Sequence, residues 1–549
     1  MLTTSLLALV SMSALPQEAP GPGVTSSATC AECHSSSPDA VAMRDSLGGA
    51  IAPYDLWQSS MMANASRDPL WRAAVSIEVA TTPGARAEIE EECMRCHAPM
   101  GHRVGLKTHE TDSLLHLLDC SGEKADLTRD GVSCTICHGI APDGLGTPAT
   151  YSGRFELDPW RRMFGPHEEP FPNPMRMRTG FTPTHGEHLV ESRLCATCHT
   201  LETHAHGADG TQRDEAFLEQ AVYLEWRNSD FVDEDGVEGD LARSCQDCHL
   251  PTHDEVGVRT RTTIARNPAG RDFPRTKPRR PFGRHLLVGG NTLVLSMLRD
   301  HGPELGATAP REAFEATLEA TREQLGERTA ALGVSGERTA EGLDLEVAVR
   351  NLTGHKLPTG HPTRRVWLRL VVRDAEGAVV FASGSFDDRG RLLGAGGAPL
   401  PSELAEGPLE PHRDEVRSGD EVVSYEALAG DEEGRPTFAL TRATRWLRDD
   451  RLLPEGWSPE HAEASRTAPV GVEGDESFRG GVDTAHYRLP LSTPGPLRVE
   501  ATLLYQPLGA RWAAELLRYE TPEVQRFAEL YEQADARPEV LAEASLSIP

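Results

Sequence analysis

Residues 195–199 read Cys-Ala-Thr-Cys-His, and this pattern of two cysteines separated by two residues and followed at once by histidine occurs five times. Two thiols at this spacing lie along one side of a short helical turn. There they can form thioethers with the two vinyl groups of one porphyrin, and the adjacent imidazole can bind its iron. The sequence therefore predicts five c-type haems. The predicted attachment cysteines are Cys30, Cys33, Cys93, Cys96, Cys134, Cys137, Cys195, Cys198, Cys245 and Cys248, and the predicted proximal iron ligands are His34, His97, His138, His199 and His249.

The cysteine count leaves little room for other uses of these pairs. Ten of the eleven cysteines fall into the five pairs, and only Cys120 is left over. Zinc sites built from two such pairs would leave one pair unused and would not require a histidine after each pair. Disulfides between cysteines this close on a helical turn have poor geometry. Haem attachment is thus the favoured interpretation, and we expect Cys120 to be a small buried residue.

A sixth ligand is needed on each iron if every haem is six-coordinate. Two imidazoles favour the ferric state and a low potential, whereas a methionine ligand, here Met61, Met62 or Met100, would raise it. Histidines outside the motifs are abundant up to position 301, where eleven occur: His102, His109, His116, His167, His185, His188, His204, His206, His253, His285 and His301.

Sequence context ranks the candidate distal ligands. His285 is followed by Leu-Leu-Val-Gly-Gly, whose small residues would let a porphyrin approach the backbone. His185 and His188 lie just before the fourth motif, and His167 follows Phe-Gly-Pro. His355 lies in a loop between two β segments, from which it could pin a second domain to the haems. We therefore expect distal ligands among His285, His185, His188, His167 and His355.

The pattern of apolar residues divides the chain and predicts an α+β protein. Residues 25–305 hold all five motifs in short, Pro- and Gly-rich segments, as expected of a mostly helical and irregular haem domain. Residues 310–335 predict a connecting amphipathic helix, with Phe314, Leu318, Leu325 and Leu332 on one face. From 340 to 508 apolar residues alternate with polar ones, and Asp374–Gly377 suits a hairpin turn, which indicates a β-sandwich. Residues 509–549 predict a C-terminal helix and tail.

Charge and the N-terminal residues bear on location and partners. The net charge of −29 argues against nucleic acid or an anionic membrane surface as partner, and it could steer a basic redox protein. The apolar run Leu6–Val10 favours a signal peptide over residues 1–20, although no basic residue precedes it. No later stretch is apolar enough for a membrane span. We therefore expect an exported protein, periplasmic or on the outer surface.

Several segments resemble a family of large bacterial pentahaem cytochromes whose haem region is related to the tetrahaem cytochrome of ammonia oxidisers. The resembling segments are Trp57–Ala65, Leu194–Thr200, Tyr223–Trp226, His285–Asn291, Asn351–Gly360, Arg451–Pro454 and Tyr505–Pro507. The resemblance implies an N-terminal haem domain and a C-terminal β domain. It implies no substrate.

Three functions remain open from the sequence. The favoured one is electron transfer, with other cytochromes or a quinol-linked complex as redox partners. The second is an oxidoreductase in which one five-coordinate haem acts on a small nitrogen or sulfur oxyanion. No Cys-x-x-Cys-Lys motif, which marks pentahaem nitrite reductases, is present, and no catalytic residue is assigned. The third is an electron-transfer subunit of a larger respiratory complex.

Overall fold

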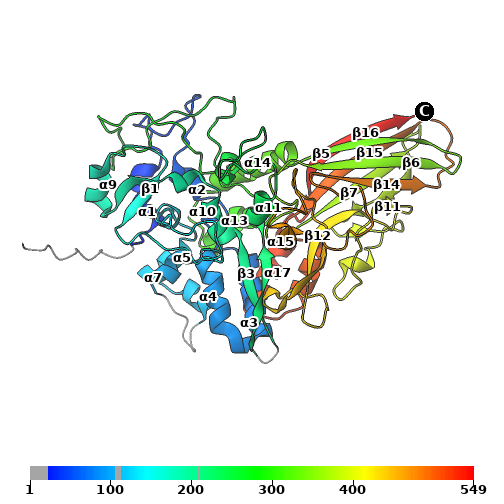
Figure 1. The fold of residues 1–549 in the computed structure, drawn as a ribbon, viewed down its shortest axis with the longest axis horizontal. Coiled ribbons are helices and arrows are strands. Elements are labelled where there is room, and N and C mark those ends of the chain that lie inside the picture. The colour runs from blue at the N-terminus through cyan, green and yellow to red at the C-terminus, as the bar shows by residue number, and fades with distance from the viewer. Residues whose placement is uncertain (1–22, 106–112, 208–209) are drawn as a thin grey trace, which may run out of the picture.

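The computed structural model describes residues 23–105, 113–207 and 210–549. The chain forms an N-terminal region of short helices and loops and a C-terminal region dominated by β-sheet (Figure 1). This confirms the predicted α+β class. The predicted signal peptide and the candidate His109 lie outside the described residues.

The N-terminal region consists mainly of helices of one to three turns joined by long loops. Its helices are α1 Ser27–His34, α2 Pro53–Trp57, α3 Pro69–Thr81, α4 Arg86–His97, α5 Pro99–Arg103, α6 Leu114–Asp119, α7 Glu123–Arg129, α8 Cys134–Cys137, α9 Pro172–Thr179, α10 Arg193–His199, α11 Val222–Arg227, α12 Cys245–His249 and α13 Thr292–Leu305. Two small strand pairs complete it. They are the parallel β1 Arg162–Gly165 with β2 Thr182–His185, and the antiparallel β3 Leu201–His206 with β4 Gln212–Gln220.

Every predicted haem motif lies at the C-terminal end of a helix. The motifs complete α1, α4, α10 and α12, and α8 is followed directly by His138. The helical turn places both thiols of a motif on one side, as their spacing predicts. The apolar core of this region is divided into small clusters, such as the one formed by Met100, Ile136 and Phe155 with their neighbours.

The C-terminal region contains two main sheets. One has the strand order β11 Glu415–Val416, β14 Val482–Leu489, β6 Leu343–Asn351 and β5 Ala330–Arg338. The other has the order β13 Arg445–Asp449, β12 Ser424–Gly430, β7 Arg365–Arg373, β15 Leu497–Gln506 and β16 Glu539–Ile548, with β8 Val379–Ser383 also paired to β7. Short pieces between them are β9 Ser385–Phe386, β10 Leu392–Leu393 and α15 Ala464–Thr467.

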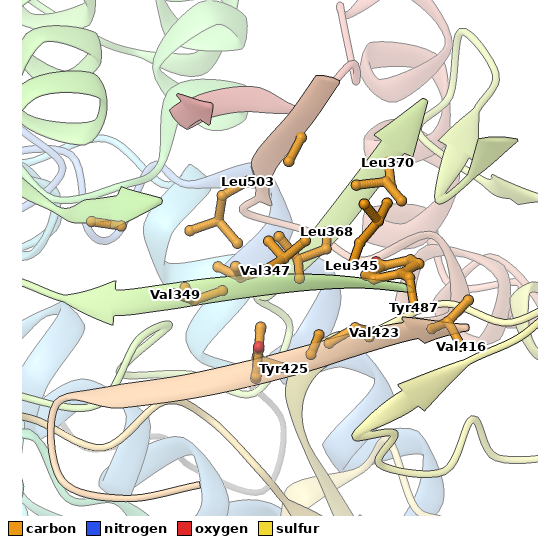
Figure 2. Close-up of a cluster of buried hydrophobic side chains, with 14 of the residues drawn as sticks. Leu345, Val347, Val349, Leu368, Leu370, Val416, Val423, Tyr425, Tyr487 and Leu503 are labelled. Atoms are coloured by element: carbon orange, nitrogen blue, oxygen red, sulfur yellow. The ribbon is translucent and has the colours of Figure 1, made fainter. Parts of the chain in front are cut away.

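The two sheets share one apolar core. Leu345, Val347 and Val349 alternate along β6 and are buried, while the residues between them face outward. Their side chains meet those of Leu368 and Tyr425 from the other sheet (Figure 2). Burial of this alternating set is the main force that holds the sheets together, because apolar area removed from water stabilises by about 25 cal/mol per Å².

The ends of the β region differ from the sequence expectation. The connecting helix, α14 Arg311–Arg328, is shorter than the predicted 310–335, because β5 begins at Ala330 and pairs along its length with β6. The segment after residue 508 forms α16 Ala510–Leu516 and α17 Pro522–Gln533, and then returns to the sheet as β16. The β region therefore extends beyond 508, since every second residue near the C-terminus faces the sheet core.

An apolar core also joins the two regions. It combines Ile77 of α3 and Met297 of α13 with Trp512 of α16 and Phe527 of α17. Helix α17 packs along α3, as Figure 1 shows. Within the described residues, no helix has the length and apolar character needed to cross a membrane.

Candidate haem sites

The imidazoles of four motifs share one hydrogen-bonding arrangement. Nδ1 faces a backbone carbonyl at 2.9 Å in His34 (Ile264), 3.3 Å in His97 (Ala65), 2.6 Å in His138 (Phe164) and 2.7 Å in His249 (Val288). A carbonyl can only accept, so Nδ1 carries the proton and Nε2 keeps its lone pair free for a metal. His199 shows no such bond within the described residues.

The five motif imidazoles keep accessible surface: four are half-buried, and that of His199 is exposed. Desolvation by the surrounding protein lowers the pKa of His97 and of His199 to about 4, and it also lowers the pKa of the other three. The neutral form that binds iron is thus favoured at neutral pH. Accessible surface and, in four of the rings, a free Nε2 fit a ring that faces a porphyrin iron.

The attachment thiols of different motifs meet in the interior. Cys30 lies close to Cys134, Cys96 to Cys198 and Cys195 to Cys245. All eleven cysteines are free thiols. No cluster of three or more His, Cys, Asp or Glu side chains within the described residues could hold a metal ion. The free thiols fit porphyrin attachment.

The candidate distal ligand His285 lies opposite a motif histidine. Its ring centroid is 6.3 Å from that of His138, with 21° between the ring planes. A metal–imidazole bond is about 2 Å long, so this separation leaves room for one metal ion between the two rings. Nδ1 of His285 faces the Gly283 carbonyl at 3.0 Å, which leaves its Nε2 free as well. His138 and His285 would therefore be able to hold the same haem iron.

His355 reaches the haem region from the β region. It lies in the loop between β6 and β7, and its Nδ1 faces the Lys356 carbonyl at 2.9 Å. The ring is half-buried and close enough to His249 for their charges to interact. A free Nε2 beside a motif histidine suits a distal ligand supplied by the second domain.

A buried charge network fixes this loop. Glu225 of α11 accepts hydrogen bonds from the Lys356 amide and the Thr359 hydroxyl, at 3.1 and 2.5 Å. Arg451 pairs with Glu225 at 3.1 Å and with Asp449 at 2.7 Å. Two acidic and two basic side chains therefore balance in the interior, as buried charges require.

The remaining sequence candidates have less suitable surroundings. His188 is buried, and its Nε2 faces the Ile140 carbonyl at 3.0 Å, so this nitrogen is engaged and the ring packs against Phe164. His185 ends β2 and lies near His167, whose pKa is lowered by burial and by Arg279. Neither His185 nor His167 has the carbonyl-bound Nδ1 that the motif rings share. Cys120 is not fully buried; its thiol lies 3.7 Å from Nε2 of His116.

Two histidines that sequence context did not single out have surroundings worth noting. Nδ1 of His204, on β3, faces the Arg213 carbonyl at 3.1 Å, which leaves Nε2 free. His361 lies deep in the protein near His97, its ring edge against Trp512, and burial lowers its pKa to about 3. Its Nδ1 accepts from the Thr363 amide at 3.3 Å, so Nε2 carries the proton. The position of His361, six residues after His355 in the same loop, was the available signal.

Comparison with known proteins gives one family match and one similar fold. Residues 29–139, which contain the first three motifs, match the family model described as cytochrome c554 and c-prime. This part of the chain is therefore similar to c-type cytochromes. The fold of the chain is similar to the crystal structure of a penta-heme cytochrome c552 from Thermochromatium tepidum, with a TM-score of 0.51 and 18% identity over 95% of this chain and 99% of that chain. No curated protein matches the chain significantly.

Proposed function

We propose that this cytochrome carries electrons through five covalently bound haems in the bacterial cell envelope. Each of its five motifs ends a helical turn with a histidine, and four of these imidazoles share the same carbonyl-bound Nδ1. When bound, haem would supply reversible one-electron exchange at its iron. The similarity to a penta-heme cytochrome supports the number of haems.

The contacts between thiols of different motifs carry this proposal. They join the first motif to the third, the second to the fourth and the fourth to the fifth. Cys137 of the third motif is also near Cys198 of the fourth. Porphyrins attached to neighbouring thiols would lie close to one another. The five sites therefore support one continuous route, with the fourth motif at its branch point.

Expression in a host that ligates haem to cysteine tests the proposal. We expect a coloured protein whose intact mass exceeds that of the polypeptide by five haems, together with a pyridine haemochrome count of five. Serine variants of one motif at a time should each lower both numbers by one. A colourless protein with the mass of the bare polypeptide would overturn the proposal.

An enzymatic function is the second candidate, and the surroundings of the second motif favour it. His361 presents a protonated Nε2 on the side of His97, where it could donate a hydrogen bond to a small ligand. Burial raises the pKa of nearby Glu219 to about 8 and that of Glu78, which provides proton donors. Ferric EPR with nitrite, hydroxylamine or CO tests this candidate. A high-spin signal that shifts on ligand addition supports it, and uniformly low-spin, inert haems exclude it.

We also propose a periplasmic or outer-surface location, with other cytochromes or a quinol-linked complex as redox partners. The proposed covalent attachment of haem supports this location. A module of a larger respiratory complex would co-elute with its partner in size-exclusion chromatography of the native extract, whereas a free carrier would elute alone.

A further inference from the structure

A basic segment crosses the surface of the haem region. Residues 256–284 hold nine arginines and lysines and one aspartate, whereas the whole chain has 84 acidic and 55 basic residues. Six of these basic side chains are exposed and, among the described residues, form no ion pair or side-chain hydrogen bond: Arg259, Arg261, Arg271, Arg275, Lys277 and Arg280. The segment therefore creates a positive electrostatic potential on part of the surface of a strongly acidic protein.

The other charges of the segment are used internally. Arg266 donates to the carbonyls of Ser35 and Glu32 at 2.7 and 2.8 Å, and Arg279 donates to those of Glu168 and Glu169. The carboxylate of Asp272 accepts from the amides of Val41 and Ala42, at 3.0 and 2.9 Å. Because this aspartate is engaged by backbone amides, it does not pair with the exposed arginines. The exposed carboxylates of Glu168 and Glu169 border the segment, and that of Glu255, just before it, lies 3.8 Å from Arg284.

A second segment runs beside the basic one. The amide of Met43 donates to the Thr263 carbonyl at 3.0 Å, and the Ser46 hydroxyl donates to Asp254. Residues 41–47 and 254–280 therefore form one continuous surface, which we call the strap face.

The strap face also exposes apolar side chains. Val41, Leu47, Val256 and Val258 are 76%, 65%, 60% and 47% exposed. Apolar side chains in the middle of a surface with charged residues around them are the usual composition of a protein–protein interface. The strap face thus combines a contact patch with a field that attracts negative charge.

The first motif lies directly beneath this surface. The Ile264 carbonyl, in the middle of the basic segment, accepts from Nδ1 of His34 at 2.9 Å. Arg266 closes the end of α1 through the carbonyls of the same motif helix. A partner seated on the strap face would therefore be next to the first haem site.

We propose that the strap face docks an acidic one-electron carrier protein and serves as the electron port of the first motif. The proposal rests on the electron-transfer function proposed above. One electron passes between the partner and the cytochrome, with one oxidised and the other reduced, and no bond forms or breaks. An anionic membrane would meet the repulsion of the whole molecule, because its charge extends over the entire approaching face. A small acidic protein would interact mainly with the charges of the strap face, since charges farther away than about 8 Å are screened at physiological salt.

Binding of an acidic flavodoxin to the full-length oxidised cytochrome tests the proposal. The test variant carries Arg259→Glu, Arg261→Glu and Arg275→Glu. The control carries Arg479→Glu, Arg488→Glu and Arg498→Glu, which reverses three exposed arginines on the β region. We expect the dissociation constant at low salt to rise about tenfold or more in the test variant and less than twofold in the control. Binding to the wild type should weaken as salt increases, although both proteins are acidic.

Three outcomes would overturn the proposal. They are equal weakening in both variants, wild-type binding that strengthens with salt, or loss of binding to phosphatidylglycerol vesicles in the test variant while flavodoxin binding is unchanged. Absorbance of the cytochrome during mixing with reduced flavodoxin separates this result from the function proposed above. If the cytochrome becomes reduced at the same rate in both variants, the strap face is not the electron port, but the proposed electron-transfer function stands. A protein that takes up no electrons contradicts the carrier itself.

Discussion

Lys356 and Asp449 form an ion pair in the interior of the protein, with 2.7 Å between Nζ and Oδ2 and side chains that are 1% and 2% exposed. Burial alone would raise the pKa of Asp449, but Arg451 and Lys356 hold it down at about 2. The pair stands at the junction of the two regions, because the Lys356 amide also binds Glu225 of the haem region.

We expect Lys356→Met to destabilise the protein strongly. Removal of the lysine leaves a buried carboxylate without its partner, which costs about 3–5 kcal/mol. Guanidinium denaturation followed by tryptophan fluorescence measures the change. Arg350→Gln is the control, because its pair with Glu455 is 57% and 38% exposed and is worth about 1 kcal/mol or less. Equal effects of the two substitutions would contradict the role of the buried network.

Because of His412, we expect the folding stability of the protein to decrease at alkaline pH. Burial opposes the charged ring, yet the Asp450 and Asp475 carboxylates, 2.9 and 3.0 Å from its nitrogens, raise its pKa to about 9. The folded pKa lies above the ordinary value of 6.5, so the stabilisation is complete below pH 6.5 and is lost as the pH rises through 9. In melting curves, His412→Gln should lower Tm most at pH 6 and least near pH 10. His486→Gln, at a more exposed site, should show no such trend.

Substitution of His285 tests the axial pair with His138. His285→Gly removes one imidazole, so we expect one of the low-spin ferric EPR signals to convert to a high-spin signal. His285→Met should keep that haem low-spin and raise its midpoint potential. His188→Gln is the matched control, because His188 is also buried near this motif but binds the Ile140 carbonyl through Nε2. Conversion to high spin in His188→Gln instead would reverse the assignment.

We expect ionisation of Glu219 to make the midpoint potential at the second motif depend on pH. Burial, together with the neighbouring Glu78, raises its pKa to about 8, and the carboxylate acts on Cys93 of the second motif. Ionisation above pH 8 adds a negative charge that favours the ferric state, so one midpoint potential should fall as the pH rises, by at most about 59 mV per pH unit. Redox titrations between pH 6 and 10 measure this. Glu219→Gln should remove the slope, and Glu215→Gln, an exposed position on the same strand, should leave it intact.

Local patterns predicted the parts of the molecule that short segments determine. The Cys-x-x-Cys-His spacing requires a helical turn, and each motif forms one. Alternation along Leu343–Val349 corresponds to the buried face of β6, and Asp374–Gly377 forms the turn between β7 and β8, with Gly377 at φ 85°. Leu332 was placed on a helical face and instead lies in β5, because pairing with β6 extends to Ala330.

Long-range relationships could not be read from the sequence. His188 and His285 are both candidates from the sequence, and the structure separates them by the nitrogen that faces a carbonyl, Nε2 in His188 and Nδ1 in His285. His361 resembles any loop histidine until the loop is seen beside His97. The net charge predicts a basic partner, whereas the strap face has the opposite sign. A sum over the whole chain hides a segment of nine basic residues.

The loop at residues 352–360 has a consequence for how the protein is assembled. All ten attachment cysteines precede this loop in the chain, so they leave the ribosome before it does. His355 can join the haem region only when β6 and β7 have taken their places in the two sheets and Lys356 has met Asp449. The haem region is therefore completed only when the β region folds. A fragment that ends before the β region would lack His355 at its haem site.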